Sequence, residues 1–202
     1  MPLPAGRRAW SRRTAPKSSD PRPTVADVHR VYVDETKAKG YVLAAAVVLP
    51  ADVTEIRRTV RGLIAPGQPR VHMKAEKTPR QHVILSSMVA LAISVTLYEA
   101  DSRTYRTDIA RRHACLAGLV DDQAGLCEHL VLESDTTQDA RDRQALIELT
   151  RAAGCRDTMT YEHRTANAEP LLSIPDAVAW AWARGGDWRR RVEPVVERIV
   201  RV

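Results

Sequence analysis

Residues 31–48, Val-Tyr-Val-Asp-Glu-Thr-Lys-Ala-Lys-Gly-Tyr-Val-Leu-Ala-Ala-Ala-Val-Val, decide the fold of this chain. Two apolar, β-branched runs flank a short polar break that contains a glycine, and this pattern predicts an antiparallel hairpin. A strand with Val31 and Val33 on one face places Tyr32 and Asp34 on the other. Because an acid at the end of an apolar strand is costly unless a metal, a base or water meets it, Asp34 is the first candidate site residue.

The rest of the chain alternates between β-branched runs and stretches with apolar residues three and four apart. We expect strands at residues 28–34, 41–49, 93–100, 128–133 and 158–162. We expect helices at residues 52–65, 78–92, 105–120, 138–153, 171–183 and 188–200, and a short extended piece at 70–74. Strands that first cluster and then alternate with helices predict an α/β fold, a mixed five-stranded sheet covered by helices. The helical crossovers favour parallel placement of the strands around Val131 and Met159.

The length of 202 residues allows one well-filled domain and a tail, which we place at residues 27–202 and 1–26. The tail is rich in proline and serine and has no apolar period, so we expect it to be disordered. It carries six basic residues and one acid, a net charge of +5 out of the chain's +6, which leaves +1 for the rest. Such an arm can hold nucleic acid by non-specific charge attraction, but a solvated, dispensable leader has the same composition.

Several classes of protein do not fit the sequence. No apolar run approaches the roughly 20 residues of a membrane span, and arginines interrupt the first 26 residues where a secretory signal would be apolar. The three cysteines have no C-x-x-C spacing, which argues against zinc and a disulfide framework and favours a cytoplasmic location. No glycine-rich phosphate loop precedes a helix. The oligomeric state is left open by the sequence.

Three acids stand apart from the ordinary surface ones. Asp34 and Glu133 close apolar strands, and Asp176 lies in an apolar helical stretch. Ligands of such sheets gather at the carboxyl ends of parallel strands, so the first two carboxylates converge if their strands are neighbours. Clustered carboxylates repel one another unless a divalent cation binds them, and Mg²⁺ or Mn²⁺ suits oxygen ligands. Two such ions about 4 Å apart can activate water and stabilise the leaving oxygen of a phosphodiester.

Four segments, in this order and spacing, resemble a bacterial ribonuclease H-like family catalogued as domain of unknown function 3800. Val31-Tyr-Val-Asp-Glu-Thr is similar to its Asp-Glu-Ser-Gly opening, and His72 follows the first helix. Leu130-Val-Leu-Glu stands at the fourth strand, and Leu171-Leu-Ser-Ile-Pro-Asp-Ala-Val-Ala-Trp is similar to the family's Leu-Gln-x-Ala-Asp-x-x-Ala helix. The resemblance covers roughly residues 28–185.

The resemblance implies a ribonuclease H-like sheet with an acidic, metal-binding site that hydrolyses RNA or DNA. It makes Asp34, Glu133 and Asp176 ligands of Mg²⁺ or Mn²⁺ and catalytic residues, and it makes His72 a group that assists proton transfer. Glu76 would line the same cleft. The weaker metal candidates are Glu35, Glu76 and Asp135.

Departures from the family pattern support a second function. Thr36 and Lys37 replace Ser-Gly, Arg70 stands where the family often has a carboxylate, and Glu133 replaces the commoner Asp, with Asp135 two residues on. These changes favour a catalytically inactive module that binds nucleic acid or protein; a third hypothesis is a scaffold with no nucleic-acid role.

Each candidate also has a purely structural interpretation. Asp34 could cap a turn, the residues after Glu133 could cap the next helix, and Asp176 could form a capping box with Ser173. A lone histidine such as His72 is often structural. Trp188 could stack on a base, but packing explains it too.

Overall fold

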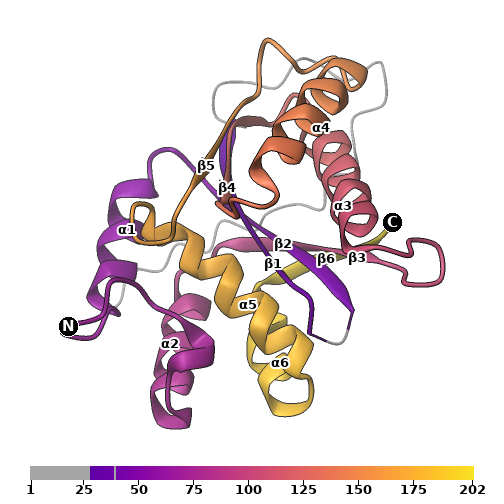
Figure 1. The fold of residues 1–202 in the computed structure, drawn as a ribbon. Coiled ribbons are helices and arrows are strands. Elements are labelled where there is room, and N and C mark those ends of the chain that lie inside the picture. The colour runs from indigo at the N-terminus through magenta and orange to yellow at the C-terminus, as the bar shows by residue number, and fades with distance from the viewer. Residues whose placement is uncertain (1–27, 39) are drawn as a thin grey trace.

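The computed structural model describes residues 28–38 and 40–202, so the predicted disordered arm lies outside the described residues. Six strands form one mixed sheet in the order β5-β4-β1-β2-β3-β6 (Figure 1). Their bounds are β1 His29–Thr36, β2 Tyr41–Val48, β3 Ser94–Ala100, β4 Cys127–Glu133, β5 Thr160–Arg164 and β6 Val196–Arg201.

The hairpin is confirmed, because β1 pairs with β2 in antiparallel register. The parallel placement of the later strands is confirmed too, since β1 pairs with β4 and β4 pairs with β5 in parallel. Val33 of β1 lies opposite Leu132 of β4. Asp34 and Glu133 are the next residues of these two strands, so both acids lie at the same level of the sheet; Glu133 ends β4, whereas β1 extends two residues beyond Asp34, to Thr36.

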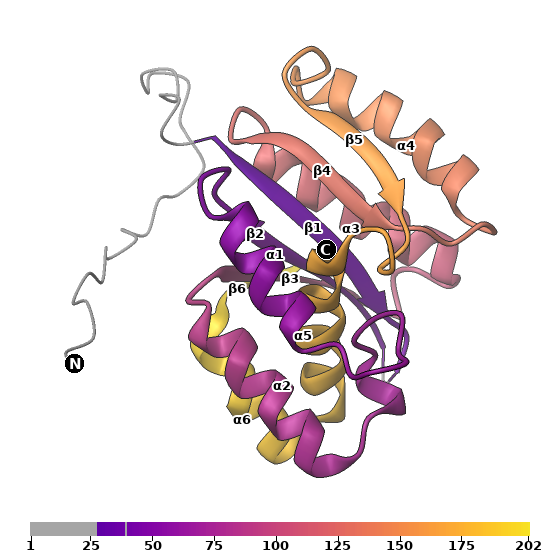
Figure 2. The same ribbon diagram turned by 90° about the vertical axis from the view of Figure 1, so that its left-hand side faces the viewer.

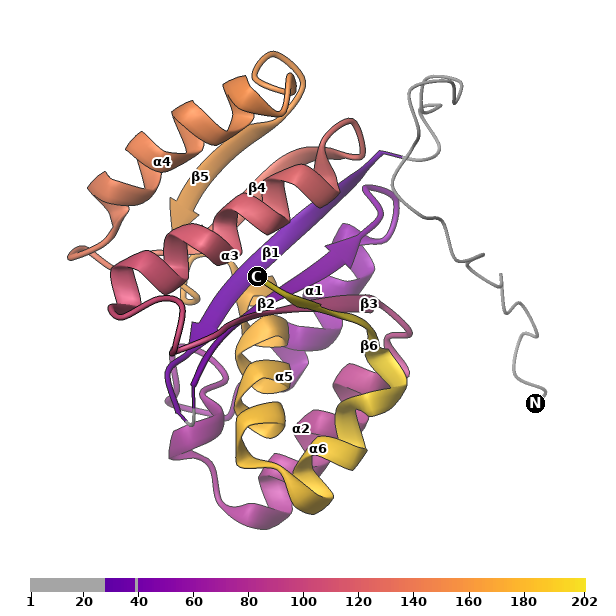
Figure 3. The ribbon, with the colours of Figure 1, turned by 90° about the vertical axis from the view of Figure 1, so that its right-hand side faces the viewer.

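Helices cover both faces of the sheet. Figure 2 shows α1, α2, α5 and α6 on one face, and Figure 3 shows α3 and α4 on the other. The helices are α1 Val53–Gly62, α2 Thr78–Ala90, α3 Asp108–Gln123, α4 Asp139–Ala152, α5 Ser173–Arg184 and α6 Gly186–Val192. Short 3-10 turns are formed by Met73–Ala75, Pro170–Leu172 and Glu193–Val195. Within the described ranges, no helix has both the length and the apolar character needed to cross a membrane.

Two predictions are wrong at the C-terminal end. The sheet has six strands in the described residues instead of five, and the helix predicted at residues 188–200 is shorter. The helix α6 ends at Val192, and β6 adds a sixth strand beside β3. Pro194 cannot donate a backbone hydrogen bond, so the α-helix does not continue through it; the 3-10 turn Glu193–Val195 follows α6, and β6 begins at Val196. The residues after it then satisfy their backbone groups on the open edge of β3, a partner that is invisible in the local pattern. The piece at 70–74 is extended only in part, because Met73 begins a 3-10 turn.

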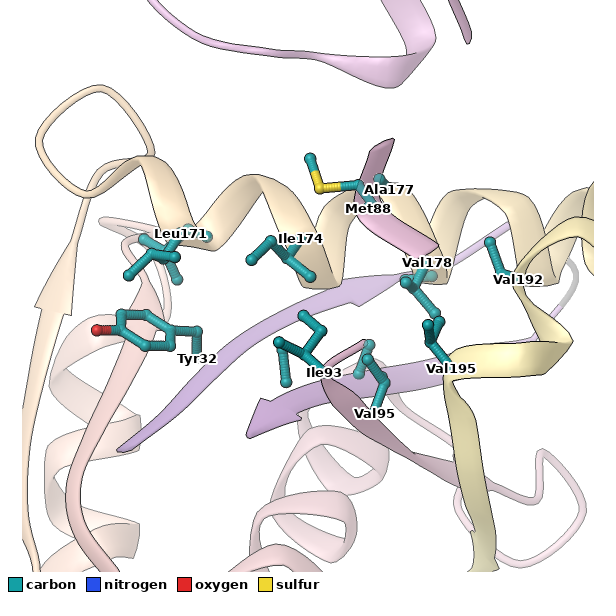
Figure 4. Packing of buried hydrophobic residues seen from close by; sticks show 14 of the residues in the cluster. Tyr32, Met88, Ile93, Val95, Leu171, Ile174, Ala177, Val178, Val192 and Val195 are labelled. Carbon is teal, nitrogen blue, oxygen red and sulfur yellow. The ribbon is translucent and has the colours of Figure 1, made fainter. Parts of the chain in front are cut away.

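The alternation of β1 separates two cores. Tyr32 lies in the core on the α5 side, whereas Val31 and Val33 lie in the core on the α3 and α4 side. On the α5 side the fully buried Ala44 and Ala46 of β2 present small side chains, which lets the helix lie close to the sheet. Figure 4 shows the apolar side chains of α5 directed at the strands beneath it. This packing holds the first turn of α5 beside the end of β1.

We predict that Ile174→Ala lowers the free energy of unfolding by about 2–4 kcal/mol, because Ile174 is fully buried between α5 and the sheet. The matched control is Ile147→Ala on α4, whose side chain is 41% exposed and whose loss is expected to cost under about 1 kcal/mol. Urea denaturation of both variants measures the difference. Equal costs for the two variants would contradict this packing.

Candidate functional site

Asp34 lies near the carboxyl end of β1, two residues before Thr36, on the face that α5 covers. The backbone N–H of Glu35 donates to its Oδ1 at 2.7 Å. Its carboxyl group also hydrogen-bonds the carboxyl group of Glu133, the last residue of β4. Asp176, in the first turn of α5, is close enough for its charge to act on Asp34. The structure therefore brings together the three acids that the sequence analysis singled out.

Burial raises the pKa of Asp34 well above its ordinary value, and the negative charges of Glu133 and Asp176 raise it further. The hydrogen bond to Glu133 acts in the same direction, because two carboxyl groups can share a hydrogen bond only when one is protonated. Desolvation and like charge together make this group one that needs a proton or a cation.

Asp176 connects α5 to the segment between α1 and α2. Burial raises its pKa, the nearby His72 partly offsets this, and the charge of Glu133 raises it again. It accepts a hydrogen bond from the backbone of Met73, but its buried Oδ2 has no hydrogen-bond partner among the described residues. Ser173 begins α5 and its hydroxyl is likewise unpartnered there, so the capping box with Asp176 does not form.

Two cationic or protonatable side chains reach the acids from residues 70–72. The Nδ1 of His72 lies 3.9 Å from Oδ2 of Asp176, too far for a hydrogen bond, and the His72 side chain is 42% exposed. Arg70 donates a hydrogen bond from Nη1 to Oε1 of Glu133. A guanidinium therefore already compensates part of the negative charge of the cluster.

The weaker metal candidates have other partners. Glu35 points to the opposite face of the sheet, where Arg112 donates a hydrogen bond to it. Oε2 of Glu76 lies 3.7 Å from Nε of Arg80, four residues further along the chain. Asp135 accepts hydrogen bonds from the backbone and hydroxyl of Thr137, and these hold its pKa below the ordinary value. Their metal roles stay predictions, but these contacts do not favour them.

A buried ionic network around Arg112, which the sequence analysis missed, lies on the far side of β1. Arg112 donates to Asp142 on α4 at 2.7 Å, and Nε2 of His163 on β5 lies 3.1 Å from the same carboxylate. Burial raises the pKa of Asp142, but hydrogen bonds from His163 and Arg112 outweigh it and hold the pKa below its usual range. One pattern could have revealed the network: Arg112 falls in the same helical stripe as Leu116 and Leu119, so its side chain had to face the core.

A divalent cation fits the donors of the first cluster, although they are not yet arranged around one. Within residues 28–38 and 40–202, no group of three or more His, Cys, Asp and Glu side chains has an arrangement that could hold a metal ion as it stands. The donors are carboxylate oxygens, which Mg²⁺ and Mn²⁺ prefer, and the unpartnered Oδ2 of Asp176 is an available ligand. Glu133 would have to leave Arg70 before all three acids could face one ion.

The fold and the cluster define an α/β protein with a mixed sheet and a buried acidic site at the carboxyl ends of two parallel strands. No protein-family model matches the chain, and no curated protein sequence matches it. Among solved structures, it is similar to a crystal structure of a mutant Bst-RNase HIII, with a TM-score of 0.46 and 14% identity. The match covers 85% of this chain and 57% of that chain, so this chain spans less than two thirds of that protein's length. At this TM-score the likeness decides neither the fold nor the function.

We predict that Asp34→Asn stabilises the metal-free protein near neutral pH and that its advantage shrinks as the pH falls toward the ordinary carboxyl pKa. With a raised folded-state pKa, the native state holds a proton that the unfolded state has released, so stability falls as the pH rises between the two pKa values. Asparagine keeps the acceptor for Glu35 N–H and can donate to Glu133 without ionising. Chemical denaturation in EDTA across this pH range measures the difference from the unsubstituted protein.

Asp135→Asn is the control with the opposite sign. The folded-state pKa of Asp135 is lowered, so its contribution is present at neutral pH and is lost as the pH falls. This variant is expected to lose stability at neutral pH and to match the unsubstituted protein in acid. A pH-independent effect of Asp34→Asn would show that Asp34 is not held protonated.

Proposed function

We propose that this protein is a metal-dependent nuclease that hydrolyses phosphodiester bonds of RNA or DNA, with Asp34, Glu133 and Asp176 as ligands of Mg²⁺ or Mn²⁺. The observation that carries the proposal is the convergence of these three acids, from β1, β4 and α5, around a buried carboxyl group whose pKa is raised well above its ordinary value. A fold gains no stability from such a cluster, so a cation-binding role is its best explanation. The sequence resemblance to a ribonuclease H-like family supports the same proposal.

Each residue of the acidic site has its own role in this proposal. Asp34 and Asp176, held by β1 and the first turn of α5, are the rigid ligands, and Glu133 completes the set when it leaves Arg70. A bound divalent cation supplies a Lewis acid that lowers the pKa of water and neutralises charge on a phosphate. With its Nδ1 facing Asp176, His72 has Nε2 left to exchange a proton with the attacking water or the leaving oxygen.

Arg70 has two possible roles. Once Glu133 turns to a cation, the released guanidinium stands beside the site and can bind a phosphate oxygen. If Arg70 instead stays on Glu133, it takes the place of a cation, and the protein is an inactive ribonuclease H-like module that binds nucleic acid or protein. The hydrogen bond between Arg70 and Glu133 is the specific observation that favours this second function.

We expect the full-length protein to cleave at least one of single-stranded RNA, single-stranded DNA, their duplexes or an RNA–DNA hybrid in the presence of Mn²⁺ or Mg²⁺. Asp34→Asn is expected to lower the rate by about 100-fold or more, because it removes a charged ligand from the site. The matched control is Asp108→Asn, which removes an exposed acid at the start of α3 and is expected to leave the rate unchanged. Full activity of Asp34→Asn, or no cleavage of any substrate, would contradict the proposed function.

Metal affinity distinguishes the two roles of Arg70. We predict that Arg70→Gln tightens Mn²⁺ binding by about tenfold, since it frees Glu133 from an ion pair that competes with the metal. Isothermal titration calorimetry of the unsubstituted protein and the variant measures this without reference to activity. Binding by the variant alone would favour the inactive module, and weaker binding by the variant would show that Arg70 supports the metal site.

A further inference from the structure

An aromatic cluster lies at the far end of α5, outside the acidic site. Trp180 on α5 and Trp188 on α6 contact each other edge to face, with ring centroids 5.0 Å apart. His82 on α2 lies against Trp188 at 4.8 Å with a 45° tilt. These three rings are only half-buried, and they come from three helices that lie on the same side of the sheet (Figure 2). We call Trp180, Trp188 and His82 the aromatic cluster.

The turn between α5 and α6 creates the cluster. Gly185 and Gly186 both have positive φ angles, 74° and 56°, which side-chain-bearing residues rarely adopt. Two such residues in succession end α5 and reverse the chain at once, so that Trp188 folds back against Trp180. The glycines therefore serve the placement of a partly exposed indole ring.

The neighbouring Trp182 differs from the two tryptophans of the aromatic cluster in its burial and in its contacts. Trp182 is 6% exposed and donates from its indole N–H to Glu99 at 3.0 Å. The guanidinium of Arg189 lies over its ring at 3.6 Å from the centroid. In the aromatic cluster, Arg184 lies at 5.1 Å from the Trp180 ring and 5.6 Å from the Trp188 ring, so neither indole is tightly covered by it.

Positive charge is concentrated at the same place. Residues 184–191 hold four arginines and one acid, a net charge of +3, whereas all of residues 27–202 carry only +1. The single acid, Asp187, pairs with Arg190 and Arg191 at 3.4 and 2.7 Å. Arg184 and Arg189 also lie near indole rings, Arg189 the closer of the two. The tryptophans also pack in part against the α5-side core, but half-buried aromatic rings within such a patch suit a ligand that offers both flat rings and negative charge.

We infer that the aromatic cluster, together with Arg184, is a stacking platform for single-stranded nucleic acid. Unpaired bases can stack on indole rings while their phosphates meet the arginines, whereas a duplex hides its base faces. Between Asp176 and Arg184, α5 rises by about 12 Å, so the platform lies within reach of the acidic site along one strand. In naming a single strand as the substrate class, this inference rests on the proposed nuclease function.

The test separates binding from cleavage by omitting metal. Anisotropy of a labelled single strand of about 12 nucleotides, measured with the full-length protein in EDTA, reports the platform alone. We predict that Trp188→Ala weakens binding by about 5- to 100-fold and that Trp188→Phe, which keeps a ring, loses less. Arg184→Ala is expected to weaken binding and to lower the slope of log affinity against log salt by about 0.7. The matched control, Arg143→Ala, removes one exposed positive charge from α4 on the other face of the sheet and is expected to cost no more than twofold.

The outcomes are distinct. Three results would overturn the platform. They are failure of the unsubstituted protein to bind single strands in EDTA, equal affinity for single strands and a duplex, and equal losses of affinity in Arg184→Ala and Arg143→Ala. Circular dichroism checks that each variant folds, and if Trp188→Ala does not, Trp188→Phe and Arg184→Ala decide the matter. Intact, ring-dependent binding without cleavage in Mn²⁺ would leave the platform standing and refute the nuclease.

Discussion

The structure depends on holding one half-buried carboxyl group close to two others. Asp34 lies near the end of β1, a strand at the centre of the sheet, and β4 and α5 bring Glu133 and Asp176 to it. Each element is held there by apolar packing, which does not diminish the repulsion at its end. The guanidinium of Arg70 on Glu133 reduces the cost, and the raised pKa of Asp34 makes that carboxyl group take up a proton more readily than an ordinary one. Both compensations are reversible, which sets the cluster apart from a fixed ion pair.

The charged residues on the two faces of β1 have different partners. On the α3 and α4 face, Glu35 is neutralised by Arg112, which also binds Asp142. That network is largely buried and ion-paired, although Nδ1 of His163 has no hydrogen-bond partner among the described residues, and it links α3, α4 and the sheet at the cost of desolvation. On the α5 face the acids outnumber their partners, and one oxygen of Asp176 has none among the described residues. Two adjacent residues in one strand thus have different surroundings: Glu35 is ion-paired with Arg112, and Asp34 lies beside two other acids.

Helix α5 joins the features that concern function. Its apolar face packs on the sheet, its first turn holds Asp176, and its last turn precedes the glycine turn that positions the aromatic cluster. A rigid helix fixes the separation of the two ends, whereas a loop would leave it variable. The acidic site and the aromatic cluster are thereby held on the same side of the sheet, at the two ends of one helix.

The sequence by itself determined the hairpin and the parallel placement of β4 and β5, because period-two alternation and short apolar runs between helices are local patterns. It also singled out Asp34 and Glu133 as acids that follow apolar runs, and Asp176 as an acid in an apolar helical stretch. It did not determine β6, since the run after Pro194 became a strand only where β3 offered unpaired backbone groups. Nor did it reveal which charges meet: Arg70 finds Glu133, 63 residues away, and Arg112 finds Asp142, 30 residues away. Such pairs follow from the distances and burial that only tertiary packing creates.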